Sequence, residues 1–202
     1  MRGLSASAPG ETEDLGILKD DSALIERTLR DAADRFDVIL TTGGASRGDE
    51  DHILDVLDRL GQQHMWQLAI KPGRPMMFGT IGSSVFLGLP GNPVAAMVCF
   101  LLYARPVLSV LAGGRFLEPQ SFQVPAGFDI AKKKADRREF YRGYLETDEN
   151  GVQVARKFMR DGSGLITGLR EADGFIEIPE DTTQIKAGDM VAYLPFSGFG
   201  IR

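Results

Sequence analysis

The stretch that determines the fold class is residues 38–51, Val-Ile-Leu-Thr-Thr-Gly-Gly-Ala-Ser-Arg-Gly-Asp-Glu-Asp. Its first three residues form a continuous apolar run between Asp37 and the glycines, the pattern of a strand buried on both faces. Apolar residues at helical spacing follow the loop over residues 53–60, and Gly61 ends them. A buried strand, a glycine-rich loop and a helix in this order predict one unit of an α/β domain.

Helix and strand signals alternate through the rest of the first half. Residues 24–36 have helical spacing after a capping cluster at Asp20-Asp21-Ser22, and Asn92 is expected to cap a long helix with Pro93 at its first position. Strands are expected at residues 65–70, 76–78 and 85–87. Strands separated by helices predict a mostly parallel sheet covered on both faces, an α/β/α three-layer domain over residues 1–114.

The pattern changes after Gly113-Gly114. Short β-type runs alternate with turns, and Asn150-Gly151 is a strong hairpin signal. These features predict a small all-β domain, a barrel or a sandwich, over residues 118–202, with the boundary near residues 115–119.

Composition and charge exclude several classes of protein. The formal net charge of −5 argues against a nucleic-acid binder, because phosphate affinity comes from clustered Lys and Arg. The single cysteine, Cys99, rules out an internal disulfide and fits a reducing compartment. Residues 93–112 are nearly all apolar, but Arg105 and Pro106 lie within them, so a buried core helix is a better interpretation than a membrane span.

The loop after the first strand has the composition of an anion site. Gly43 and Gly44 let the backbone approach a ligand and direct N–H groups at it, and the hydroxyls of Thr42 and Ser46 add donors. The following helix N-terminus favours negative charge, and the carboxylates beside this loop suggest a bridging divalent metal such as Mg²⁺. The alternative is a tight turn followed by an acidic N-cap.

Two further loops follow predicted strands. Residues 71–75 hold two cations, Lys71 and Arg74, on a rigid backbone that suits an anionic substrate, and the alternative is a solvated turn. Residues 90–93 present a rigid helix N-terminus, for which the alternative is simple capping. Because loops at the carboxyl ends of strands share one crevice in an open parallel sheet, the three loops together favour a phosphate- or oxyanion-handling enzyme.

Taken in order, these motifs resemble a known family. Asp14-Leu15-Gly16-Ile17, Asp20-Asp21 and residues 42–46 with Gly48, Asp49 and Asp51 are similar to the molybdopterin-binding domain shared by MoeA and MogA proteins. Residues 70–75 and 88–94 resemble the MoeA branch, and Phe140-Tyr141-Arg142-Gly143 with Gly162-Ser163 resembles its C-terminal β domain. The chain therefore resembles the C-terminal half of a molybdopterin molybdenumtransferase of the MoeA / gephyrin E-domain family, with a MogA-like domain that lacks its first strand.

The resemblance implies a cytoplasmic, homodimeric enzyme that uses Mg²⁺ and molybdate to convert adenylylated molybdopterin into molybdenum cofactor, with release of AMP. It implies no nucleic-acid or membrane partner. Arg142 and Ser163 match residues proposed to contact the oxyanion, and a tetrahedral dianion does prefer a guanidinium and hydroxyl donors. The implied catalytic residues are Asp20, Asp51, Lys71, Arg142 and Ser163; the metal ligands are Asp20, Asp49 and Asp51; and the substrate-binding residues are Thr42, Gly43, Gly44, Ser46, Arg74, Pro90, Gly91, Asn92 and Pro93.

The sequence departs from the family pattern in places. Gln67 stands where some relatives carry lysine, and Arg47 occupies a position that is often small and apolar. Relatives carry two earlier domains, so we expect a fragment, a truncated reading frame or half of a split protein, which self-associates and inserts little molybdenum alone. The alternatives are a MogA-type molybdopterin adenylyltransferase, against which the β tail counts, and a non-catalytic scaffold module of the gephyrin E type.

Overall fold

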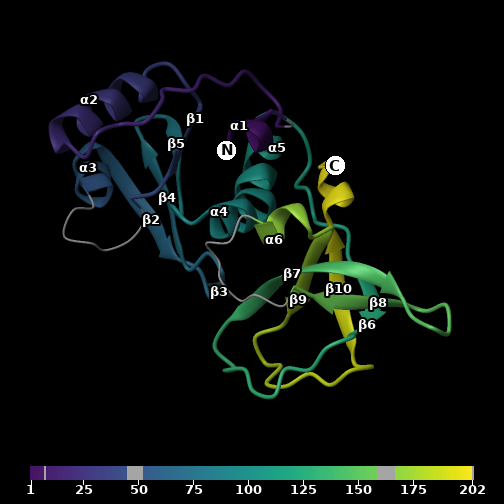
Figure 1. Ribbon diagram of the computed structural model, residues 1–202. Helices are drawn as coiled ribbons and strands as arrows, with labels where there is room; N and C mark the ends of the chain where they lie inside the picture. Colours follow the sequence, from purple (N-terminus) through teal and green to yellow (C-terminus); the bar gives the residue numbers. More distant parts are fainter. Residues whose placement is uncertain (7, 45–51, 159–166, 202) are drawn as a thin grey trace. The chain divides into compact units, whose positions relative to one another are not determined.

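The computed structural model describes residues 1–6, 8–44, 52–158 and 167–201 (Figure 1). The chain forms two compact units, residues 1–68 with 73–117 and residues 69–72 with 118–202. The first unit contains a four-stranded sheet and the second a six-stranded sheet. Each unit buries an apolar core of its own.

The first sheet has the strand order β1-β5-β4-β2 and is mixed. β1 (Val38–Thr42) and β5 (Ser84–Leu89) are parallel, whereas β4 (Pro75–Ile81) runs antiparallel to both β5 and β2 (Gly61–Gln67). Three strands therefore run in one direction, and the expectation of parallel strands was wrong for β4, which lies between β5 and β2 and makes both of these pairings antiparallel. The reason is the two-residue turn Gly82-Ser83, because a connection this short can join only antiparallel strands.

Helices cover both faces of this sheet. α2 (Ser22–Ala33) and α3 (His52–Leu60) bury Ile25, Leu29, Val56 and Leu57 in one core cluster with Phe86 of β5. Figure 1 shows the helical segment that follows β5 on the other side of the sheet. A short helix, α1 (Arg2–Ser5), begins the chain. The predicted α/β/α three-layer fold is confirmed.

The segment after β5 is one continuous helix of three parts. α4 (Pro93–Cys99) passes into a π-helical turn, η1 (Phe100–Ala104), and then into α5 (Arg105–Leu111). Asn92 caps it as predicted, because its side-chain oxygen accepts hydrogen bonds from the amides of Val94 and Ala95 at 3.1 and 3.2 Å. The widened turn ends two residues before Pro106, which has no amide hydrogen to donate.

This helix is also the apolar segment that raised the question of a membrane span. Among the described helices it alone is long and apolar enough to cross a membrane, with 19 residues and a mean hydropathy of 2.0. More than half of its most apolar window, 56%, is buried inside the chain. Such burial is typical of a core helix in a globular protein and favours that interpretation.

The second unit is built almost entirely of strands. Its sheet has the order β3-β7-β9-β10-β6, β8 pairs with β7, and only β3 and β7 are parallel. An isolated parallel bridge joins Ala126, the residue after β6, to Ala155 of β8. The last strand in the order therefore approaches β8, as in a sheet that curls towards a barrel. The elements are β3 (Ile70–Lys71), β6 (Phe122–Pro125), β7 (Arg138–Thr147), β8 (Gln153–Lys157), α6 (Thr167–Arg170), β9 (Gly174–Ile178), β10 (Met190–Pro195) and the 3₁₀ turn η2 (Phe196–Phe199).

One short segment joins a different unit from its sequence neighbours. The sequence interpretation placed residues 69–72 in the first domain, but β3 pairs with β7, with Lys71 opposite Glu139. The amide of Arg138 also donates to the carbonyl oxygen of Ala69 at 2.9 Å. The second sheet therefore includes a strand from far upstream in the sequence.

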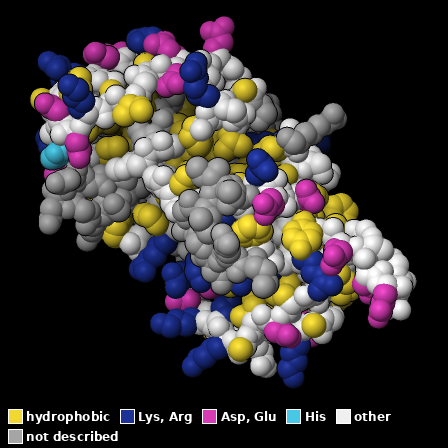
Figure 2. All heavy atoms as spheres, viewed as in Figure 1, with side chains coloured by type: hydrophobic (Ala, Val, Ile, Leu, Met, Phe, Trp, Pro, Cys, Tyr) yellow, Lys and Arg dark blue, Asp and Glu magenta, His cyan; other side chains and the backbone are white. Residues whose placement is uncertain are grey.

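Charged side chains of both signs appear on the face displayed in Figure 2. Glu26 of α2 illustrates how they pair, since it contacts Arg30 at 2.7 Å and Arg59 at 3.0 Å. The hydrogen bond from Arg59 is the main cause that holds the pKa of Glu26 below its usual value. Such exposed pairs add little stability because water screens them.

We predict that Asn92→Ala lowers the free energy of unfolding by about 1 kcal/mol, because two helix amides lose their acceptor. Asn92→Asp is the matched control, since a carboxylate oxygen can accept the same two hydrogen bonds. Urea unfolding followed by circular dichroism measures both. An unchanged midpoint for Asn92→Ala would mean that Pro93 alone fixes the start of the helix.

Candidate functional site

The first candidate loop follows β1. Gly43 and Gly44 have φ angles of 86° and 71°, a region that side-chain-bearing residues rarely adopt. The amide of Gly43 donates to the carbonyl oxygen of Leu89 at 3.0 Å, which ties this loop to the end of β5. Thr42 is exposed at the edge of the sheet. Ser46, Asp49 and Asp51 lie outside the described residues.

The third candidate loop follows β5 and meets the first. A β-carbon placed on Gly91 would lie 3.3 Å from the α-carbon of Gly43, so the two loops are in close contact. They meet because β1 and β5 are parallel neighbours and end at the same edge of the sheet. Pro90 is buried and Pro93 is exposed. The structure therefore brings together Gly43 and the residues at the start of α4.

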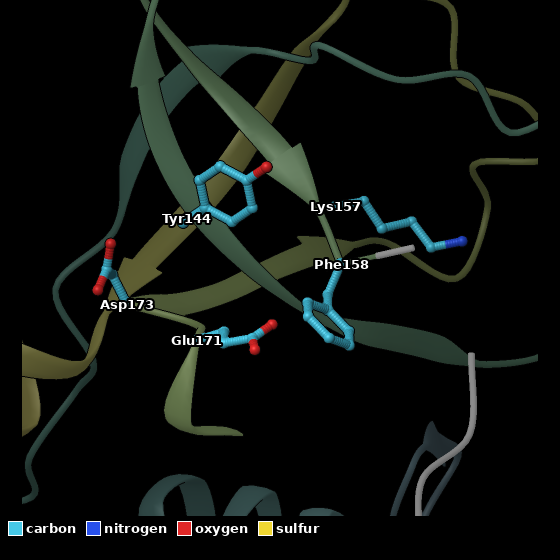
Figure 3. A pocket seen from close by; sticks show the side chains of 5 residues that line it. All are labelled: Tyr144, Lys157, Phe158, Glu171 and Asp173. Atoms are coloured by element: carbon cyan, nitrogen blue, oxygen red, sulfur yellow. The ribbon is translucent and has the colours of Figure 1, made fainter. Parts of the chain in front are cut away.

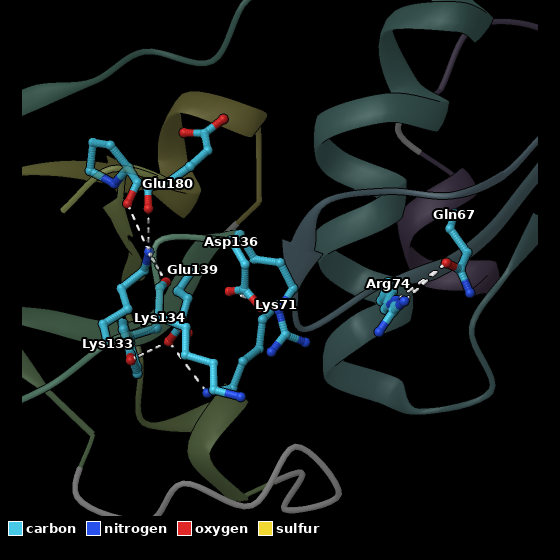
Figure 4. A network of polar contacts seen from close by, with 11 residues as sticks. Gln67, Lys71, Arg74, Lys133, Lys134, Asp136, Glu139 and Glu180 are labelled. Atoms are coloured by element: carbon cyan, nitrogen blue, oxygen red, sulfur yellow. Dashed lines mark hydrogen bonds and ion pairs between the residues drawn. The ribbon is translucent and has the colours of Figure 1, made fainter. Parts of the chain in front are cut away.

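The second candidate loop is divided between the two units. Arg74 belongs to the first unit and precedes β4, whose amino end lies at the same sheet edge because β4 is antiparallel to β5. Its guanidinium donates to the side-chain oxygen of Gln67 at 3.3 and 3.2 Å (Figure 4). Gln67, the departure from the family pattern noted above, thus anchors Arg74. The loop follows β2, which runs in the same direction as β5 because both are antiparallel to β4, so the sequence reasoning placed it at the correct edge of the sheet.

Lys71 belongs to the second unit. Its ammonium lies 3.3 Å from a carboxylate oxygen of Glu139, a residue of β7 that is only 6% exposed. The hydroxyl of Tyr141 donates to the same carboxylate oxygen. Sequence reasoning assigned no role to either residue, although Tyr141 lies in the quoted motif Phe140-Tyr141-Arg142-Gly143 and Glu139 directly precedes it.

Arg142 also lies on β7 and is 7% exposed. Its guanidinium carbon is 5.3 Å from the centre of the Phe158 ring, a cation–π contact. Gly168 of α6 packs against it, since a β-carbon there would lie 2.5 Å from a guanidinium nitrogen. Because side chains alternate along a strand, Arg142 and Glu139 point to opposite faces of β7. Ser163, its predicted partner, lies outside the described residues.

A pocket of about 420 Å³ opens in the second unit (Figure 3). Glu171 and Asp173 contribute two carboxylates to it, and the Glu171 carboxylate points towards the Phe158 ring. Two carboxylates against the single ammonium of Lys157 disfavour an oxyanion, and Arg142 does not line this pocket. The pocket therefore does not coincide with the predicted oxyanion site. Its lining residues are Tyr144, Lys157, Phe158, Glu171 and Asp173.

The predicted metal site is represented by one described residue. Asp20 is exposed just before α2, and its neighbour Asp21 caps that helix by accepting from the amide of Leu24 at 2.8 Å. The described parts of the chain contain no group of three or more His, Cys, Asp and Glu side chains that could hold a metal ion. Asp20 and the other described residues therefore do not by themselves form a magnesium site.

Cys99 has no catalytic character. It is fully buried on α4, and its sulfur contacts the carbonyl oxygen of Gly73 at 3.5 Å. Burial raises the pKa of its thiol to about 12, so the reactive thiolate is not formed at neutral pH. It serves as a small core residue, as the sequence indicated.

Comparison with known proteins connects this geometry to a family. A family model described as a probable molybdopterin-binding domain matches residues 2–110, more than half of the chain. A second model, the MoeA C-terminal region (domain IV), matches residues 123–196. The chain belongs to the MoeA / gephyrin family.

Individual members of the family support the same assignment. A molybdopterin molybdenumtransferase of Haemophilus influenzae is 34% identical over 93% of this chain and 46% of its own length. A gephyrin of Dictyostelium discoideum is 27% identical over 88% of this chain and 28% of its own length. A crystal structure of a MoeA protein from Pyrococcus horikoshii, 29% identical, superposes with a TM-score of 0.76 over 96% of this chain and 47% of that one. The chain thus spans half or less of the length of these MoeA-family relatives.

One atom of this MoeA-family chain stands out beside the two touching loops. The hydroxyl of Thr41 is buried and has no hydrogen-bond partner in the described part of the chain. Thr41 is the last residue but one of β1 and lies opposite Gly88 of β5. A buried hydroxyl without a partner costs about 1–3 kcal/mol, so an orphan here indicates a place where a bound molecule could supply the missing bond.

We predict that Thr41→Val raises the free energy of unfolding of the ligand-free chain by about 1 kcal/mol, because the shape is kept and the orphan hydroxyl is removed. Ser84→Ala is the control. The Ser84 hydroxyl donates to the carbonyl oxygen of Ala33 at 2.9 Å, so its removal should destabilise the chain. Denaturant unfolding compares the two. Equal destabilisation by both changes would mean that the Thr41 hydroxyl is already satisfied in solution.

Proposed function

We propose that this chain carries the molybdenum-inserting function of its family: adenylylated molybdopterin reacts with molybdate to give molybdenum cofactor and AMP. The observation that carries the proposal is the contact between Gly43 and Gly91 at one sheet edge, in a chain whose two halves both match MoeA models. The names of the relatives support the same reaction. The match to the MoeA C-terminal region argues against the adenylyltransferase alternative.

In this proposal the first unit binds the phosphate end of the substrate. The amide of Gly43 is already used by Leu89, so it fixes the loop and is not free to bind an anion. Anion contacts then come from Thr42, Gly44 and Ser46, with residues 90–93 forming the adjoining wall. Arg74 adds a positive charge at the same edge, and a guanidinium can hold a phosphate through two parallel hydrogen bonds.

The second unit contributes two cations that act on different parts of the substrates. Arg142, with Ser163, is the proposed molybdate contact, whereas Lys71, which pairs with Glu139 on the opposite face of β7, offers a positive charge to the anionic molybdopterin. Arg142 is largely desolvated and is packed against Phe158 and Gly168, which fixes its guanidinium. A fixed, desolvated guanidinium stabilises an anion more strongly than one that moves freely in water.

Three finer statements belong to the same proposal. We infer a Mg²⁺ requirement carried by Asp20, Asp49 and Asp51, because carboxylate oxygens are the ligands that this ion prefers. We infer a homodimer by analogy with the family, and a cytoplasmic location from the single unpaired cysteine. The gephyrin relative also keeps a second candidate function open, a binding module without turnover.

We predict that Gly44→Val weakens binding of molybdopterin at least tenfold, because valine at a φ of 71° is strained and its side chain crowds the loop. Gly82→Val is the control, since Gly82 also has a positive φ of 58° but lies in the β4–β5 turn. Calorimetric titration measures the affinity. Equal affinities for Gly44→Val and the unaltered chain would remove this loop from the site.

The reaction itself is tested in a chimera that joins this chain to the remaining part of the Haemophilus influenzae relative. AMP release from adenylylated molybdopterin is followed against molybdate concentration, with and without EDTA. We expect Arg142→Ala to raise the molybdate concentration needed for half-maximal rate by a factor on the order of 100, with little change in molybdopterin binding.

Arg156→Ala is the matched control for Arg142→Ala. Arg156 lies on the neighbouring strand β8, and its guanidinium is held by Glu146 at 2.6 Å and by the carbonyl oxygen of Gly127 at 2.7 Å. Circular dichroism shows whether each variant remains folded. A folded Arg142→Ala chimera with unaltered molybdate dependence would exclude this role, and no AMP release by the parent chimera would exclude the reaction.

A further inference from the structure

The ammonium of Lys71 is held by a buried carboxylate. The side chain of Lys71 is 54% exposed, whereas that of Glu139 is 8% exposed, and the two meet at 3.3 Å (Figure 4). Their backbones are register partners in the parallel β3–β7 pair. Strand pairing therefore places the backbone of Lys71 beside that of Glu139. The ion pair then restricts the ammonium end of the flexible lysine side chain.

Glu139 is itself fixed from the core of the second unit. The hydroxyl of Tyr141 donates to the carboxylate oxygen that Lys71 contacts. The Tyr141 ring packs against the buried core cluster, and the ammonium of Lys157 lies 4.5 Å from the ring centre. A continuous set of contacts thus runs from the barrel core through Tyr141 and Glu139 to Lys71.

Lys133 shows what a purely structural lysine looks like in the same unit. It is 6% exposed, and its ammonium donates to the carbonyl oxygens of Lys134, Pro179 and Glu180 at 3.2, 2.9 and 3.2 Å. All three of its donors are used. Within the described residues Lys71 uses one donor, on Glu139, and its remaining two are available to a ligand.

We propose that Glu139, held by Tyr141, is the positioning residue of Lys71, fixing its ammonium so that the two remaining donors can bind an anionic substrate. The part of this inference that concerns the substrate rests on the proposed function. The part that concerns Lys71 itself does not. A carboxylate beside the lysine also has an opposite effect, because its negative charge repels an anion. The proposal therefore states that fixing the ammonium outweighs this repulsion.

The order of the Lys71 ammonium can be measured without any ligand. In the 202-residue chain with ¹⁵N-labelled lysine, nuclear magnetic relaxation of the ammonium groups reports how far each is restricted. We expect Glu139→Gln and Tyr141→Phe to lower the order of Lys71 towards that of an exposed lysine. Lys133 should stay unchanged in both and serves as the internal reference. Glu177→Gln, which removes a carboxylate that pairs with Arg138 at 2.8 Å, should leave Lys71 unchanged.

Binding of molybdopterin, measured by calorimetry, then separates positioning from charge. Glu139→Gln removes the negative charge, while Glu139→Asp keeps the charge and shortens the reach. If Glu139 positions Lys71, both variants bind molybdopterin roughly tenfold more weakly, about the effect of one charge-assisted hydrogen bond. If Glu139 acts only by its charge, Glu139→Gln binds molybdopterin more tightly and Glu139→Asp is unchanged, which overturns the proposal.

Stability provides an independent check on the pairing. In the unaltered chain Glu139→Gln should lower the melting temperature, because an ion pair is lost. In a Lys71→Met background the same change should raise it, because the carboxylate there is buried without its cation. The same sign in both backgrounds, or Lys71 order unaffected by Glu139→Gln, overturns the proposal. No molybdopterin binding by the unaltered chain would overturn the proposed function, and the relaxation measurement would still decide the positioning.

Discussion

The parallel pairing of β1 with β5 is the interaction on which the candidate site depends. It aligns Thr42 with Leu89, so that both strands end at the same level. The hydrogen bond from the Gly43 amide to the Leu89 carbonyl then continues the ladder one residue beyond the strands. Because both loops start from this common point, they run close together, and a β-carbon on Gly91 would lie only 3.3 Å from the α-carbon of Gly43.

A second pairing, β3 with β7, has the same role in the other unit. The pairing places Lys71 of β3 opposite Glu139 of β7, and Arg142 follows three residues later on β7. The positions of both cations proposed to bind anions, Lys71 and Arg142, are therefore set by the register of one strand. A shift of β7 by one residue would reverse the faces of Glu139, Tyr141 and Arg142 together. The three side chains are coupled through the backbone even where they do not touch.

Local patterns in the sequence predicted the features that depend on local chemistry. The cap at Asn92, the glycines with positive φ at 43 and 44, and the change to an all-β second half follow from short-range preferences of single residues. The reversed direction of β4 was missed, because apolar runs carry no sign of parallel or antiparallel pairing. The two-residue turn at Gly82-Ser83 does indicate antiparallel pairing of β4 and β5, and it is a stronger signal of strand direction than the periodicity of the strands around it.

The partners of the site residues could not be predicted in the same way. Glu139 and Lys71 are far apart in sequence, and a glutamate at one position of a strand gives no sign that it is buried. Gln67, noted only as a departure from the family pattern, proved to be the acceptor for Arg74. Such pairs are products of tertiary packing, which overrides the average preference of a charged or amide side chain for solvent.

The placement of residues 69–72 has a consequence for the modularity of this chain. The polypeptide passes from one unit to the other three times, so a single cut in the gene cannot separate them. An excised piece comprising residues 118–202 would lack the strand that pairs with Arg138 and Glu139, and would expose an open backbone edge there. The β unit could therefore not be exchanged between proteins as a simple terminal cassette. Recombination would have to carry its small upstream strand, and Lys71 with it.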